Sequence, residues 1–87
     1  MKLGHVLMRY GLDADGNEIS GAALCASTSY KKVYNKIRDV LKIEEREAEN
    51  EEGTRIYDYD NQIVVEYGGD YETENGVRYI IESIEIL

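Results

Sequence analysis

The chain has 87 residues, 43% of them hydrophobic, and carries a net charge of −8. This length supports a single modest core, so we expect residues 1–87 to form one domain. No apolar run approaches the roughly 18 residues of a membrane helix, and the N-terminus lacks the basic and then apolar layout of a signal peptide. The single cysteine excludes an internal disulfide and is typical of a reducing compartment, so we expect a cytoplasmic protein.

The N-terminal segment is typical of a β-hairpin. Residues 2–12 predict a strand, residues 13–17 a turn, and residues 18–26 the returning strand. The predicted apolar face of the first strand consists of Val6, Met8, Tyr10 and Leu12. If the loop is residues 13–17, Leu24 lies opposite Val6 and Ala22 lies opposite Met8. The small residues of the returning strand would then let a helix approach this face closely.

Residues 27–41 contain the only strong helical pattern of the chain. Apolar and tyrosine side chains recur at intervals of three and four and share one helix face. They are Tyr30, Val33, Tyr34, Ile37, Val40 and Leu41. Ser27 or Thr28 can cap the first turn. We expect the helix to end at Leu41 and residues 42–52 to be frayed helix or loop, because their glutamates would lie near the negative end of the helix dipole.

The C-terminal half is typical of three further strands. Residues 55–59 and 62–67 flank Asp60-Asn61 and predict a second hairpin, and residues 77–87 predict the last strand. The apolar side chains of that strand change faces along its length, so a bulge near Glu82-Ser83 would be needed to keep one apolar face. The predicted order is β-β-α-β-β-β, an α+β fold with a single amphipathic helix packed on an antiparallel sheet.

Catalytic and metal-binding patterns are weak. The predicted register pairs His5 with Cys25, the only residues of their kinds, and a Cys–His couple can form a nucleophile. No neighbouring residue signals the orienting group and oxyanion donors that such a site needs, so a buried structural cysteine is the simpler interpretation. Residues 13–24 lack the glycine and glutamate spacing of a calcium loop. We therefore expect a protein that is not an enzyme and holds no cofactor or metal.

Acidic residues dominate the second half of the chain. Residues 1–42 carry seven basic and four acidic side chains, whereas residues 43–87 carry three basic and fourteen acidic ones. Carboxylates spaced along strands and turns, with tyrosines between them, can occupy a basic groove that normally holds phosphates. The predicted partner-binding surface consists of Glu44, Glu45, Glu47, Glu49, Glu51, Glu52, Tyr57, Asp58, Tyr59, Asp60, Glu66, Tyr67, Asp70, Tyr71, Glu72 and Glu74. Hydrated charges that only keep the protein soluble are the alternative interpretation.

The outer face of the predicted helix is basic. It comprises Lys31, Lys32, Lys36 and Arg38. These side chains could contact nucleic-acid phosphates in an autoregulator, but a net charge of −8 opposes approach to a polyanion. A solvated face that balances the acidic half is the simpler interpretation. A small structural module that forms a homodimer through an open sheet edge is a further alternative.

The small size, the expected one-helix sheet and the carboxylates of YDYDNQIVVEYGGDYETE make the chain similar to a class of inhibitors. It resembles the small acidic anti-CRISPR proteins of phages and mobile elements. This resemblance implies a stoichiometric inhibitor of a CRISPR-Cas effector or a similar nucleic-acid-handling defence complex. It also implies a protein partner with a basic nucleic-acid-binding surface, reached by DNA mimicry or steric block, and no role for a membrane. The basic helix departs from a uniformly acidic mimic and leaves open a contact with guide RNA or with an acidic protein patch.

Overall fold

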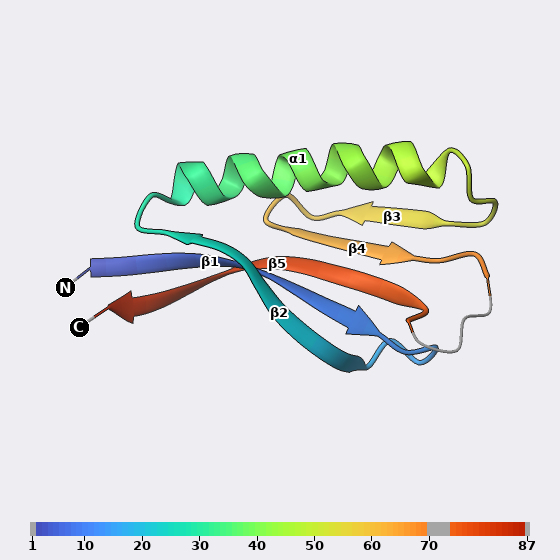
Figure 1. Ribbon diagram of the computed structural model, residues 1–87, viewed down its shortest axis with the longest axis horizontal. Helices are drawn as coiled ribbons and strands as arrows, with labels where there is room; N and C mark the ends of the chain where they lie inside the picture. Colours follow the sequence, from blue (N-terminus) through green and yellow to red (C-terminus); the bar gives the residue numbers. More distant parts are fainter. Residues whose placement is uncertain (1, 70–73, 87) are drawn as a thin grey trace.

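The computed structural model describes residues 2–69 and 74–86, which form one sheet with one helix packed on it (Figure 1). The elements are β1 (Lys2–Leu12), β2 (Glu18–Ser27), α1 (Tyr30–Ala48), β3 (Arg55–Asp58), β4 (Gln62–Glu66) and β5 (Gly76–Ile86). The strands lie in the order β2-β1-β5-β4-β3, and every neighbouring pair is antiparallel. The predicted α+β fold and its element order are confirmed.

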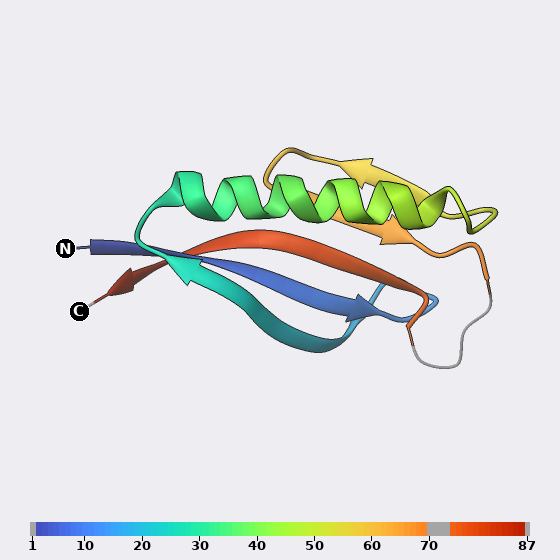
Figure 2. The ribbon, with the colours of Figure 1, turned by 45° about the horizontal axis from the view of Figure 1, so that its top comes forward.

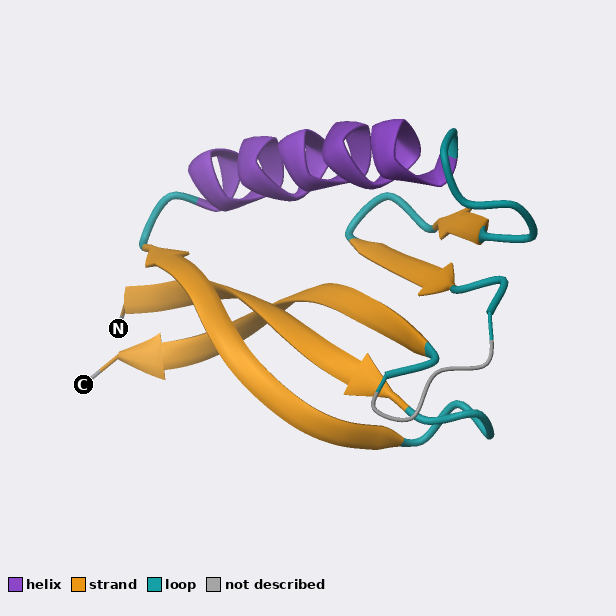
Figure 3. Ribbon diagram, turned by 45° about the vertical axis from the view of Figure 1, so that its right-hand side comes forward, coloured by secondary structure: helices purple, strands orange, loops and turns teal. Residues whose placement is uncertain are grey.

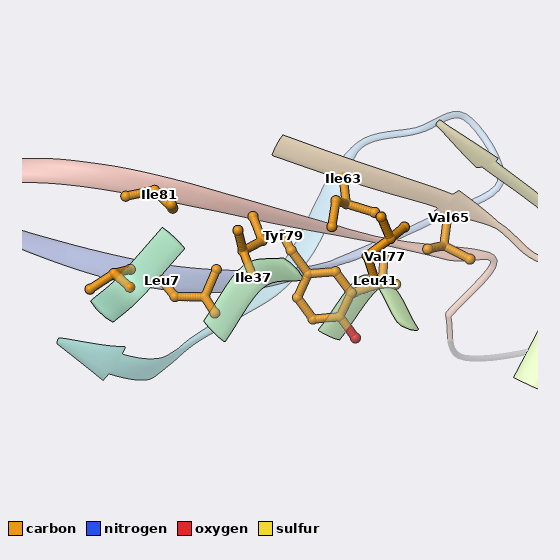
Figure 4. Close-up of a cluster of buried hydrophobic side chains, with 9 residues drawn as sticks. Leu7, Ile37, Leu41, Ile63, Val65, Val77, Tyr79 and Ile81 are labelled. Carbon is orange, nitrogen blue, oxygen red and sulfur yellow. The ribbon is translucent and has the colours of Figure 1, made fainter. Parts of the chain in front are cut away.

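The helix covers one face of the twisted sheet, and no other described element covers the opposite face (Figures 2 and 3). Apolar side chains from α1 and three of the strands meet between the two layers (Figure 4). This core comprises Leu7, Val33, Ile37, Leu41, Ile63, Val65, Val77, Tyr79 and Ile81. The predicted helical stripe supplies its helical members, which are four residues apart and therefore share one face of α1.

The first hairpin differs from its predicted register. Beside the loop, Leu12 pairs with Glu18, but two irregularities along the ladder each shift β2 by one residue. Val6 consequently lies opposite Ala26, and Met8 lies opposite Ala23, so the predicted pairings of both residues are wrong. The predicted apolar face of β1 also points the wrong way. Leu7, which is 0% exposed, lies in the core instead, because its partner on β5 is the buried Ile81.

The helix extends beyond its predicted end at Leu41 and reaches Ala48. Its cap is Ser29, rather than Ser27 or Thr28, and the Ser29 side chain accepts a hydrogen bond from the amide of Lys32 at 3.4 Å. The extension is stabilised because Glu44 points into the fold and is only 8% exposed. Even at this length, α1 is too polar to cross a membrane, and the same holds for every helix among the described residues.

Strand β5 is regular along its whole length. It pairs with β1 without interruption, from Gly76 opposite Leu12 to Ile86 opposite Lys2. The predicted bulge near Glu82-Ser83 is therefore wrong, because the ladder with β1 runs unbroken through both residues. As a result, the apolar side chains near the end of β5 lie on the face away from the helix, where Ile84 is 52% and Ile86 is 43% exposed.

Candidate functional site

Exposed carboxylates gather at one end of the molecule. The last turn of α1 and the turn that follows it carry several of them, and the 13–17 turn and the end of β4 lie at the same end of the long axis (Figure 1). We define the acidic end by its seven exposed carboxylates, which are Asp15, Glu45, Glu47, Glu49, Glu51, Glu52 and Glu66. None of the three ion pairs among the described residues includes any of them. The chain order conceals the contribution of Asp15, which only the fold brings to this end.

Two glycines hold the acidic turn against the end of β4. Gly53 has a φ of 84°, a backbone conformation that favours glycine. A Cβ atom added to Gly68 would lie 2.6 Å from the carbonyl carbon of Gly53 and would also clash with the carbonyl oxygen of Glu52. The Thr54 hydroxyl accepts a hydrogen bond from the Gly68 amide at 3.4 Å. The acidic turn is therefore displayed on a fixed backbone.

A groove of about 570 Å³ lies on the open face of the sheet beside the acidic end. Its walls come from the 13–16 turn and from the neighbouring ends of β4 and β5. Within it, Arg78 forms an ion pair with Glu18, and its guanidinium lies 5.3 Å from the centroid of the Tyr10 ring. Because Arg78 is paired, Asp15 and Glu66 leave the rim acidic, and the rim can receive a basic side chain of a partner.

Asp58 and Asp60 attach the second hairpin to the helix. The Arg38 guanidinium donates two hydrogen bonds to the Asp58 carboxylate at 2.8 and 2.7 Å, and these bonds lower the pKa of Asp58 to about 2. The Tyr34 hydroxyl donates to Asp60 at 2.6 Å, which raises the pKa of Tyr34. Asp58 and Asp60, both predicted to bind a partner, and Arg38 of the predicted basic face therefore form contacts within the fold that hold the second hairpin against α1.

A chain of polar contacts runs beneath the C-terminal half of α1. The Tyr79 hydroxyl donates to Glu44 Oε1 at 2.7 Å, and burial together with this bond raises the pKa of Tyr79 well above its usual range. On the neighbouring strand, Arg9 donates to both oxygens of Glu74 at 3.1 and 2.8 Å and lowers the pKa of that carboxyl. Glu44 thus lies inside the fold, and its predicted place on an exposed surface is wrong.

The tyrosines of the predicted surface are dispersed. Tyr59 is 59% exposed, whereas Tyr67 packs against the core, where burial raises its pKa. Tyr57 pairs with Val64 in a row on the open face of the sheet. The remaining members of the predicted surface, Asp70, Tyr71 and Glu72, lie outside the described residues.

Exposed lysines gather toward the other end of the helix. Lys31, Lys32 and Lys36 lie in the first half of α1, whose first turn lies on the side of the chain termini, away from the acidic turn (Figure 1). At a rise of about 1.5 Å per residue, Lys31 lies about 27 Å from Glu49 along the helix, whereas Lys36 lies about 14 Å from Glu45. The larger separation is about three Debye lengths at physiological salt, so the outermost charges of the two groups sense little of each other.

His5 and Cys25 do not pair across the hairpin. His5 lies opposite Ser27, and Cys25 lies opposite Leu7. The His5 Nδ1 atom is 2.8 Å from the Ser83 hydroxyl, and the His5 ring packs edge-on against Tyr30. The predicted cross-strand pairing is wrong because the irregularities in β2 move Cys25 by two positions, so the geometry offers no Cys–His couple.

Comparison of the chain with protein-family models, with curated proteins and with solved structures finds no significant match.

Proposed function

We propose that the protein acts by binding rather than by catalysis, as a stoichiometric inhibitor of a CRISPR-Cas effector or a similar nucleic-acid-handling complex in the host cytoplasm. In this proposal the acidic end occupies a basic surface that normally holds nucleic acid, by DNA mimicry or steric block. The observation that carries the proposal is the acidic end itself: seven exposed carboxylates outside the ion pairs of the described residues, several of them on a turn held by Gly53 and Gly68.

The electrostatics of the acidic end favour a cationic partner. Its carboxylates are exposed and outside the ion pairs of the described residues, so no such pair has to break before they meet lysine or arginine side chains. Complementary charge steers such an encounter and raises the association rate. A fixed backbone beneath the charges also reduces the entropy lost when a partner binds. The acidic end therefore combines the two properties that favour competition with phosphates, which are exposed negative charge and a fixed backbone beneath it.

The basic helix is a weaker candidate for the binding surface. Arg38 is held by Asp58, which leaves the three lysines Lys31, Lys32 and Lys36 as its exposed charges. Flexible lysines in the first half of one helix form a small footprint compared with the phosphate contacts of a nucleic-acid-binding protein. The geometry thus favours contact through the opposite end of the molecule.

The proposal is tested with purified effector–guide complexes and labelled target DNA. Anisotropy measures DNA binding as the protein is titrated in, at low and at raised salt. We expect the protein to displace DNA, and its affinity for the complex to fall about tenfold or more between about 50 and about 200 mM salt, because the contact is ionic. Affinity that does not change with salt would contradict charge mimicry.

A matched pair of variants separates a local contact from bulk charge. Glu47→Gln/Glu49→Gln removes two charges at the acidic end, and Asp39→Asn/Glu85→Gln removes two exposed charges elsewhere. We expect the first variant to lose inhibition and the second to retain it. Equal losses in both variants would show that net charge, rather than the acidic end, is responsible.

A further inference from the structure

The open face of the sheet is apolar along its centre. The pairing register arranges the side chains that alternate with the core residues into rows across the sheet. The central row consists of Ala23, Met8, Ile80 and Gln62. Further along β5, beyond Glu82, the exposed Ile84 and Ile86 lie on the same face. Clustered exposed isoleucines mark an interaction surface, whereas single ones on a protein surface are ordinary.

The charges on this face are balanced. Its charged side chains are Lys2, Arg55 and Arg78, and Glu18, Glu66 and Glu82. The molecule as a whole carries −8, so two copies repel each other through most of their surfaces. Away from the acidic rim of the groove these charges cancel, so this face is the part of the molecule through which two acidic copies can meet.

We infer that this face binds the same face of a second copy of the chain, around a two-fold axis that lies along the row of Met8 and Ile80. Such an axis opposes β5 of one copy to β5 of the other and reverses its direction. The two sheets then stack as aligned layers, as in a β-sandwich. The described residues of each copy supply the same patch, so the contact is self-complementary.

Two charged residues select this axis. Arg78 and Glu82 lie on β5, two residues to either side of Ile80. Tyr10 holds both: its hydroxyl donates to Glu82 at 2.7 Å, and its ring lies under the Arg78 guanidinium. The axis through Ile80 places Arg78 of each copy opposite the partner's Glu82. An axis along β5 would instead oppose Arg78 to the partner's Arg78, and like charges at an interface destabilise it.

The same axis gives the groove an occupant. Ile84 and Gly76 lie four residues to either side of Ile80, so Ile84 of one copy faces the partner's Gly76. Gly76 and Leu12 are part of the groove lining. The exposed isoleucine thus enters the groove of the other copy, and symmetry repeats this contact.

The arrangement also separates the acidic ends. Because the strands of the second copy run in the reverse direction, the acidic end of one copy lies near the opposite end of the other. The helix is on the outer side of each sheet (Figure 2), so the acidic turn after α1 remains exposed. The dimer goes beyond the proposed function: it covers Glu66 and the groove rim, but it leaves the carboxylates of α1 and of the following turn exposed and does not prevent contact through them.

Sedimentation equilibrium of charge-reversal variants tests the dimer. We expect the wild-type chain to form dimers and Arg78→Glu or Glu82→Arg alone to raise the dimer dissociation constant about tenfold or more, because each places like charges opposite each other twice. An equimolar mixture of the two variants should recover the dimer, since one chain then carries two glutamates and the other two arginines. Circular dichroism verifies that each variant is folded.

Two isoleucines of equal exposure provide a matched control. Ile84 on the open face and Ile43 on the helix are each 52% exposed. Ile84→Glu should yield monomers, and Ile43→Glu should leave the dimer intact. A monomeric wild-type chain, a mixture that associates no better than its components, or a dimer that survives Ile84→Glu would overturn the inference.

Discussion

Glu44 and Glu47 are three residues apart in α1, yet the first is buried against Tyr79 and the second faces water. The helical period explains the difference: at about 100° per residue, Glu44 lies about 20° from the buried Ile37 around the helix axis, whereas Glu47 lies about 80° from Ile37 and about 120° from Leu41. Asp58 and Glu74 resemble Glu44 in that each is bonded within the fold. An acidic segment is thus not one surface: its members divide into internal carboxylates, which stabilise the fold, and the acidic end, which does not.

The acidic end reduces the stability of its own helix. Its glutamates lie near the negative end of the helix dipole, and Arg46 is the only basic residue in the last turn. Repulsion among neighbouring carboxylates adds to this cost. Sites that lower stability in this way are often functional, which is consistent with a role in binding.

The largest expected effect comes from removing an internal carboxylate. Glu44→Ala leaves the buried Tyr79 hydroxyl without its acceptor and opens a gap beside the core, so we expect the free energy of unfolding to fall by about 2–3 kcal/mol. Urea denaturation followed by circular dichroism measures the change. Glu47→Ala is the matched control on the exposed side, and a similar loss in that variant would abolish the distinction between the two groups.

A second variant tests how firmly the acidic turn is held. In Gly68→Ala the new methyl group meets the backbone of Glu52 and Gly53, so we expect a loss of about 1–3 kcal/mol as the two segments separate. Gly16→Ala is the opposite case, because Gly16 has a φ of 84°, which strains alanine, but no atom within 4 Å of its added Cβ. Gly68 is not among the positive-φ glycines of the described residues, so its loss reports the close contact, and a Gly68→Ala variant as stable as wild type would show that this contact contributes nothing.

The ion pair of Asp58 and Arg38 predicts a smaller, pH-dependent effect. The pKa of Asp58 falls from its ordinary value of 3.8 to about 2 in the folded protein. Because the pKa of Asp58 is lower in the folded protein, the charged carboxylate stabilises the fold at pH values above its ordinary pKa. This stabilisation is lost as the pH falls from about 4 to about 2. Wild type should therefore exceed Asp58→Asn in unfolding free energy above pH 4 and converge with it below, with a modest difference because solvent screens the pair. Urea titrations across this range measure it, and a constant difference would contradict the assignment.

The smallest effect on stability is expected at the acidic end. Replacing Glu47, Glu49, Glu51 and Glu52 one at a time by glutamine should change the unfolding free energy by no more than about 0.5 kcal/mol, with any shift toward greater stability. Thermal melts compare the single variants with wild type. A clear loss of unfolding free energy at any of these positions would show that the residue stabilises the fold, as the internal carboxylates do.

Local patterns predicted much of the architecture. The interval of four between Val33, Ile37 and Leu41 is a property of neighbouring residues, so the sequence shows which face of the helix is buried. The turn signals at residues 13–17 and 60–61 separate the strands for the same reason. The concentration of acid in residues 43–87 is also visible directly in the sequence.

The errors concern contacts between distant residues. The irregularities in β2 depend on how that strand curves over β1, and they moved the partners of Val6 and Met8. The missing bulge in β5 follows from an unbroken ladder with β1, which pairs residues from the two ends of the chain. No short window of sequence contains such information.

The sequence by itself determined the order of the elements, the buried stripe of the helix and the uneven distribution of charge, because periodicity and composition are local quantities. The tertiary structure alone decided which carboxylates remain exposed, because that choice depends on side chains such as Tyr79 and Glu44, which are 35 residues apart. It also decided that Ile84 lies on the open face, since the register of β5 against β1 assigns each side chain to one side of the sheet or the other.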